Sequence, residues 1–387
     1  MSHDTLKLTD QQVLEHAHNL LQTHLPLKAA GSACTTDDLL NILLGIAVNR
    51  GTLEAVCRDL AGAPDPETVR RYLNDQLCVE DLPALERHLN TALRADIPGR
   101  VWRQARDVAI DFHDRPYYGK QSQSEGLWVR GRAHDGTTHF YRIVTAYVIL
   151  NGLRVTLAVR WVLPDRSVLA LLTDLLTSLK KQGLRIACLF LDKGFANIAV
   201  MEYLSRRHQP ALIACPIRGK TGGTRALCQG RKSYRTQHTF VSGTRSFTPS
   251  VVVCRSFTTA KRTKRLKRRA VWLIYILIHL DLSPRQARRA YRKRFGVESS
   301  YRCAGQVRGW TTSPNPVYRF MLITLSFVLL NVWVQLRWLY AQVPRRGRRR
   351  LQTTLFQLHR LAHFIRRALE RRYGCLTMIQ AVAAPRL

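Results

Sequence analysis

A change from helical to strand-like periodicity at Val108 constrains the fold of this chain most. Runs rich in β-branched and aromatic residues predict a short strand, VAI, ahead of Asp111 and a second strand over residues 137–150. Asn151-Gly152 then predicts a two-residue hairpin turn into a third strand, LRVTLAVRWVL. Three antiparallel strands are therefore expected at the start of the segment.

Helices and strands alternate in the residues that follow. An apolar-periodic helix is expected to begin at Asp165 or Ser167, and the buried strand RIACLFL ends at Asp192. A helix over residues 197–207 and a strand ALIACP come next. The order βββαβαβ, with one Asp ending the first strand and another ending the fourth, predicts an α/β domain of the RNase H-like kind. In such a domain a mixed sheet is flanked by helices.

Charge is distributed unevenly along the chain. Lys and Arg number 61 against 26 Asp and Glu, a formal charge of +35, which indicates a polyanionic partner. Residues 203–280 contain no acidic residue, and they include the run KRTKRLKRR. Charge runs are usually solvated surface. Strand-like pieces such as SVVVCRSF and AVWLIYILIHL lie in the same segment. We therefore expect a folded, basic, β-rich insertion whose cations bind along the phosphates of the polyanionic partner.

The first hundred residues are expected to form a separate helical domain. They carry 9 Lys and Arg and 14 Asp and Glu. Helices over 52–60 and 67–77 could form a helix-turn-helix with Arg70 and Arg71 on its second helix, but a dimerising helical domain is an equal alternative. We expect five segments: an N-terminal helical domain at residues 1–100, the first part of the catalytic core at 101–216, the basic insertion at 217–280, the remainder of the core at 281–343 and a basic helical tail at 344–387.

Two further features bear on where the protein works. The apolar run Phe320–Leu336 is shorter than the roughly 20 residues of a membrane span and contains Asn331 and Gln335, so a buried core helix is expected and a membrane protein is the alternative. Nine cysteines without a C-x-x-C pair predict thiols of a reducing compartment. We therefore expect a cytoplasmic, nucleoid-associated protein with no membrane partner.

Few acidic residues are available for metal-dependent chemistry between residues 101 and 310. Mg²⁺ prefers carboxylate oxygens, so a nuclease site needs about three acids from separate elements. Position at a strand end selects Asp111 and Asp192. Asp114 is an alternative to Asp111, although pairing of Asp114 with Arg115 or another neighbour is preferred.

The third acidic residue, Glu298, stands in the basic run YRKRFGVESSYR. On a helix, Tyr291, Arg294 and Glu298 at i, i+3 and i+7 share one face, with Arg302 a turn further on. That face combines a phosphate-binding guanidinium with a carboxylate. An amphipathic surface helix with ion pairs is the alternative on these residues alone.

These motifs resemble the insertion-sequence DD(E) transposases, and the resemblance spans about residues 105–335. AIDFHD, LFLDKGF and RFGVESSYR resemble the three catalytic blocks, and DFHDRPYYGK resembles a block of a mainly archaeal group. Tyr291, Arg294 and Glu298 match the spacing of the signature Tyr, Arg and Glu. The signature Lys is replaced by Gly305, so that another cation, Arg302 or Arg308, would have to complete the phosphate clamp.

The resemblance implies a transposase that cuts transposon ends and joins them to target DNA. It implies a metal site of Asp111, Asp192 and Glu298 that binds Mg²⁺, with Mn²⁺ as a substitute. Tyr291 and Arg294 would contact the terminal phosphates of double-stranded DNA, with Arg302 as a further DNA contact, and a homodimer would form on DNA. The alternatives are a stand-alone RNase H-like nuclease and a non-catalytic DNA-binding protein, either a regulator or an inactivated transposase.

Overall fold

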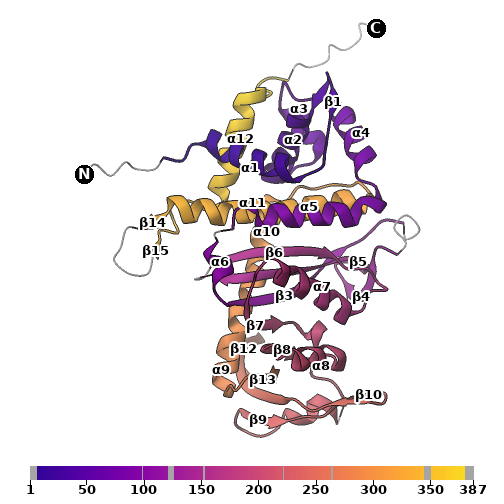
Figure 1. The fold of residues 1–387 in the computed structure, drawn as a ribbon, viewed down its shortest axis with the longest axis vertical. Coiled ribbons are helices and arrows are strands. Elements are labelled where there is room, and N and C mark those ends of the chain that lie inside the picture. The colour runs from indigo at the N-terminus through magenta and orange to yellow at the C-terminus, as the bar shows by residue number, and fades with distance from the viewer. Residues whose placement is uncertain are drawn as a thin grey trace. The chain divides into compact units, whose positions relative to one another are not determined.

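The computed structural model of the chain divides into two compact units (Figure 1). The first unit contains Met1–Ile97, Gly119–Ser124 and Tyr301–Leu387, and the second contains Pro98–Tyr118 and Glu125–Ser300. The structure describes residues 7–97, 99–120, 126–150, 153–220, 222–262, 265–343 and 350–379. The predicted domain boundaries stay predictions.

A nine-stranded mixed sheet forms the centre of the second unit. Strand β3 (Arg106–Pro116) pairs antiparallel with β5 (Thr137–Leu150), which pairs antiparallel with β6 (Leu153–Trp161). On its other side β3 pairs in parallel with β7 (Ile186–Leu191), and β7 pairs in parallel with β8 (Ala211–Cys215). The predicted succession of strands is therefore present. The predicted hairpin turn at Asn151-Gly152 lies outside the described residues.

The first strand differs from its prediction in length. It does not end at Asp111 but continues to Pro116, because β5 pairs with it from Val108 onward to the end. Pairing with β7 stops earlier, at Ile110. A further edge strand, β4 (Val129–His134), pairs with β5 and was not predicted, because its sequence VRGRAH is mostly polar.

The basic segment folds as strands that extend this same sheet. It contains β9, β10, β11, β12 and β13, at Tyr234–Gln237, Phe240–Ser242, Arg245–Phe247, Ser250–Arg262 and Arg265–Ile278. Strand β13 pairs antiparallel with β8, and β12 lies between β13 and β9. The residues Ile274–Ile278 of β13, which pair with β8, are buried in the core, while β10 and β11 form a separate hairpin.

Capped helices accompany the sheet. The Ser167 side chain caps α7 (Val168–Lys181), which decides between the two predicted starting residues, and Asn197 caps α8 (Ile198–Arg206). Ser283 forms a capping box at the start of α9 (Pro284–Arg292). A short α6 (Arg100–Arg103) precedes β3, and α10 (Gly296–Ala304) follows α9 after the 3₁₀ turn Lys293–Phe295.

The first unit is largely helical. Its helices α1, α2, α3, α4, α5, α11 and α12 span Asp10–His24, Thr36–Asn49, Leu53–Asp59, Pro66–Gln76, Leu82–Ala95, Pro316–Tyr340 and Leu358–Tyr373. Two small hairpins are formed by β1 (Ala30–Gly31) with β2 (Cys34–Thr35) and by β14 (Gln342–Val343) with β15 (Arg350–Leu351). The predicted helix pair is present as α3 and α4, where Arg70 pairs with Glu54 and Glu67, and its role stays a prediction.

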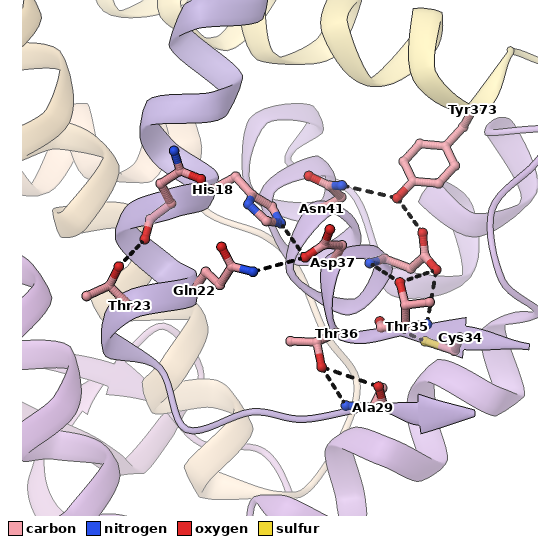
Figure 2. A network of polar contacts seen from close by, with 12 residues as sticks. His18, Gln22, Thr23, Ala29, Cys34, Thr35, Thr36, Asp37, Asn41 and Tyr373 are labelled. Atoms are coloured by element: carbon pink, nitrogen blue, oxygen red, sulfur yellow. Dashed lines mark hydrogen bonds and ion pairs between the residues drawn. The ribbon is translucent and has the colours of Figure 1, made fainter. Parts of the chain in front are cut away.

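The last described helix of the chain packs against the first two in this unit. Helix α12, yellow in Figure 1, packs against α1 and α2, which are indigo. Figure 2 shows the contact at its end, where the Tyr373 hydroxyl donates to Asp38 Oδ1 at 2.7 Å and accepts from Asn41 Nδ2 at 3.2 Å. Helix α11 is long and apolar enough to cross a membrane, but 89% of its most apolar window is buried, as expected of a core helix.

Candidate active site of paired carboxylates

Two aspartates lie side by side in the second unit, where the parallel pairing of β3 with β7 ends. Ile110 of β3 is paired in parallel register with Leu191 of β7, so Asp111 and Asp192 are the next residues on the two chains. Adjacent strands lie about 4.8 Å apart, and the register therefore brings both carboxylates to one edge of the parallel pair. The Asp111 side chain is 11% exposed and that of Asp192 is 34% exposed.

The guanidinium of Arg294 bridges these two carboxylates. Its Nη2 atom lies 2.5 Å from Asp111 Oδ1 and 3.3 Å from Asp192 Oδ1. The Arg294 side chain is 12% exposed. The sequence predicts that Arg294 contacts a DNA phosphate, which stays a prediction, but in this structure the guanidinium neutralises the carboxylates.

Two tyrosines hold Arg294 at this position. It lies in the 3₁₀ turn after α9, and its backbone oxygen accepts a hydrogen bond of 3.3 Å from the Tyr147 hydroxyl. The Tyr291 hydroxyl donates to the Leu191 carbonyl at 3.2 Å, and its ring centre lies 5.5 Å from the guanidinium carbon of Arg294. The end of α9 is thereby fixed to the end of β7. In this arrangement Tyr291 positions Arg294, and its predicted contact with DNA stays a prediction.

Burial and neighbouring charge shift the pKa values at the site. Burial raises the pKa of Asp111, the Arg294 charge lowers it in part and the negative charge of Asp192 raises it, so that the pKa lies at about 6. Burial alone would lower the pKa of Arg294, but Tyr291 and the two carboxylates raise it overall. At neutral pH Asp111 is therefore ionised and paired with a charged guanidinium.

The third predicted ligand, Glu298, lies in α10, and its side chain is outside the described residues. The single helix predicted for Tyr291–Arg302 is interrupted, because the 3₁₀ turn separates α9 from α10. Arg302 is exposed on α10. At Gly305, where the family signature has Lys, an added Cβ would meet no atom within 4 Å, so a larger side chain would fit.

The donor set fits a hard divalent cation. Mg²⁺ is typically held by one or two carboxylates together with waters, and Asp111 and Asp192 offer two carboxylates from adjacent strands. Among the side chains that the structure describes, no group of three potential ligands forms. Glu298 is therefore retained as the predicted third ligand.

Asp114 is engaged elsewhere, which favours Asp111 as the site residue. The Arg142 guanidinium binds Asp114 with two hydrogen bonds, Nε to Oδ1 at 2.6 Å and Nη2 to Oδ2 at 2.8 Å. These residues face each other across the β3 and β5 pair. The sequence predicts Arg115 or another neighbour as the partner of Asp114, and the structure has Arg142. A cross-strand partner could be found only from the register.

A stacked aromatic pair supports the backbone beside both aspartates. The rings of Phe112 and Phe195 are 4.7 Å apart and nearly parallel. Gly194 lies against the Phe112 ring, where an added Cβ would stand 3.0 Å from two ring carbons. The sequence DKGF thus needs glycine at its third position, a role that the sequence alone did not reveal. Lys293 also escaped prediction, and its Nζ pairs with Asp107 at 2.7 Å.

Comparisons with known proteins bear on the family and the fold of this chain. The family model described as a transposase DDE domain matches residues 102–317. A solved structure, the piggyBac transposase synaptic complex with hairpin DNA, is similar with a TM-score of 0.53 and 10% identity, over 96% of this chain and 80% of that one. A comparison with curated proteins gives no match. The structural likeness confirms the predicted RNase H-like fold, a mixed sheet flanked by helices.

Proposed function

We propose that this chain, which belongs to the DDE transposase family, cuts DNA at the ends of its own element and joins the freed 3′-hydroxyls to target DNA. The observation that carries this proposal is the parallel register that sets Asp111 beside Asp192. Both steps would use one site, completed by Glu298.

DDE transposases generally use divalent metal ions. We propose Mg²⁺ for this chain, with Mn²⁺ as a substitute, held by Asp111, Asp192 and Glu298. When bound between carboxylates, such ions activate the attacking oxygen and stabilise the leaving oxygen of a phosphodiester. The contribution of Arg294 is to keep two mutually repelling carboxylates together, since one of its nitrogens contacts both.

Tyr291 is a positioning residue in this scheme. Burial raises the pKa of its hydroxyl, so the group stays protonated at neutral pH, and it donates to the Leu191 carbonyl. A protonated hydroxyl that is already committed to a backbone carbonyl is suited to holding α9 in place rather than to exchanging protons. The contacts of Tyr291, Arg294 and Arg302 with DNA phosphates belong to the proposal.

Double-stranded DNA is the proposed partner, as transposon ends and as target. The strongly basic charge of the chain and the likeness to a transposase solved with hairpin DNA support it. A homodimer on DNA and a location in the cytoplasm with the nucleoid are also proposed.

The proposal is tested with a labelled duplex that carries the element's ends, incubated with Mg²⁺ and target DNA. We expect wild type to cut and join, and Asp192→Asn to bind the ends but do neither. Asp135→Asn is the matched control, because Asp135 is 69% exposed in a turn. Cutting without joining would support a stand-alone nuclease. Binding without cutting by wild type would support a non-catalytic DNA-binding protein.

A further inference from the structure

Strands β12 and β13 form a two-stranded ribbon that continues beyond the central sheet. They pair from Ser250 and Leu277 through to Arg262 and Arg265. Strand β9 accompanies β12 only as far as Val253, and β8 accompanies β13 only from Ile274 onward. Nine pairs, from Cys254 with Leu273 onward, therefore have no third strand beside them in the part of the chain that the structure describes.

The two faces at the root of this ribbon differ. Cys254 and Ser256 are buried, and the Cys254 thiol donates to the Pro284 carbonyl at 3.3 Å, so the inner face packs on α9. Arg255 and Phe257 alternate with them and belong to the outer face, where Phe257 is 46% exposed. One face is thus anchored and the other is presented to solvent.

An arginine stacked between two aromatic rings marks the outer face. The guanidinium carbon of Arg255 lies 5.1 Å from the ring centre of Phe257 and 5.8 Å from that of Trp272, its partner across the strands. Its Nη1 atom donates to the Arg231 carbonyl at 3.0 Å. This arrangement places a partly exposed guanidinium beside an exposed aromatic ring on the outer face.

The ribbon sequence is strongly positively charged, which favours a polyanionic partner. Seven of the nine residues from Lys261 to Arg269 are Lys or Arg, and no acidic residue lies anywhere in residues 203–280. Arg262 lies directly opposite Arg265 in the register, and like charges opposite each other on paired strands repel and destabilise the pair. An anionic partner that neutralises them compensates for this cost.

We propose that the β12–β13 ribbon is an arm that enters the major groove of duplex DNA beside the cleavage site, with the Arg255, Phe257 and Trp272 face directed at the nucleic acid. The major groove admits a two-stranded β-ribbon, and nine pairs extend about 30 Å, roughly one turn of duplex. The choice of DNA as ligand rests on the proposed function.

The arm is joined directly to the candidate active site. Helix α9 packs on the inner face of β12 at its start, and its other end carries Tyr291 and leads to Arg294, which contacts Asp111. Tyr275 of β13 and Tyr291 are also in ring contact, with centres 4.8 Å apart. Duplex DNA held by the ribbon root would therefore be bound by the same unit that carries the carboxylates.

The test measures binding of a mixed-sequence duplex of about 30 base pairs without divalent metal, as a function of salt. The arm variant replaces four residues by Gln: Lys261, Arg262, Lys267 and Arg268. The matched control replaces four exposed cations of α7 and α8 by Gln: Lys180, Lys181, Arg206 and Arg207. The slope of log affinity against log salt is negative, and counterion release predicts that its magnitude falls by up to about 3.6 in the arm variant, since each phosphate contact contributes about 0.9. A far smaller change is expected in the control. Equal changes in the two variants, or tighter binding of the single strand than of the duplex, would overturn the proposal.

A second measurement removes the dependence on a multiply substituted protein. A photo-reactive residue at Leu266 should crosslink to the duplex, whereas one at Gly243, in the β10–β11 turn, should not. Absence of a crosslink from position 266 would contradict the proposal that the ribbon enters the DNA groove. Neither measurement involves cutting, so the arm can fail while wild type still cuts and joins, and it can stand if wild type never cuts.

Discussion

Replacing Arg294 with Gln tests how the metal-free site is held together. The substitution removes the guanidinium that contacts both Asp111 and Asp192. Breaking a buried ion pair by removing one partner usually costs about 3–5 kcal/mol. Here we expect a smaller loss of about 2–3 kcal/mol in the free energy of unfolding, because the Asp192 side chain is 34% exposed and Asp111 can take up a proton.

Protonation of Asp111 gives this prediction a pH dependence. In wild type the pKa of Asp111 is raised to about 6, and removal of Arg294 takes away the charge that holds it down, so the pKa rises further in the variant. Below pH 6 Asp111 is mostly neutral in both proteins, and the difference in stability is small. As pH rises through 6, the wild-type carboxylate ionises beside the Arg294 guanidinium, a contact that the variant lacks, so the deficit grows.

The assay is urea unfolding followed by tryptophan fluorescence in the presence of a chelator, at acidic and at neutral pH. Arg292→Gln is the control, because Arg292 is exposed at the end of α9, two residues before Arg294, and its effect should stay within about 0.5 kcal/mol. Mn²⁺ should restore more stability to Arg294→Gln than it adds to wild type, since it supplies the missing positive charge. A deficit below about 1 kcal/mol, or one that is equal at both pH values, would refute the role assigned to Arg294.

Three further substitutions follow from contacts described above. Tyr373→Phe removes the hydrogen bond to Asp38 and should cost about 1.5–3 kcal/mol at neutral pH in urea unfolding. Burial raises the pKa of Asp38, but hydrogen bonds from Thr35 and Tyr373 lower it overall, so the difference should shrink as pH falls below 3.8; a constant difference would contradict this. Gly194→Ala forces the neighbouring phenylalanine ring to shift and should cost about 1–3 kcal/mol in thermal melting, whereas an unchanged melting temperature would refute the close approach. Asp114→Asn should keep cleavage within about tenfold of wild type, or about 1.4 kcal/mol, in the labelled-duplex assay, and complete loss would restore it as a candidate ligand.

Local sequence patterns predicted the elements that place the candidate carboxylates. The runs VAI and CLFL are apolar enough to be buried strands, and a polar residue at the end of each points to a site. The parallel register that makes Asp111 and Asp192 neighbours is a property of the sheet, so it appeared only in the structure.

Contacts between distant segments were beyond what periodicity could predict. Arg294 lies 183 residues from Asp111 in the chain, and its contact depends on how α9 is fixed by Tyr291 to β7. The interruption of the predicted helix by a 3₁₀ turn also depends on this packing. The run AVWLIYILI was predicted as a strand of a separate basic insertion, because charged residues surround it. In the structure it pairs with β8 of the central sheet, and its continuous apolar run is typical of a strand buried on both faces.

The most direct test of the account compares wild type with Glu298→Gln in Mg²⁺-dependent cleavage and joining of a labelled DNA that carries the element's own ends. Glutamine keeps the size of the side chain but removes the anionic oxygen that a metal site needs. The account predicts that wild type cuts and joins, while the variant binds the same DNA but does neither. Cleavage and joining by Glu298→Gln at the wild-type rate would contradict the three-carboxylate site.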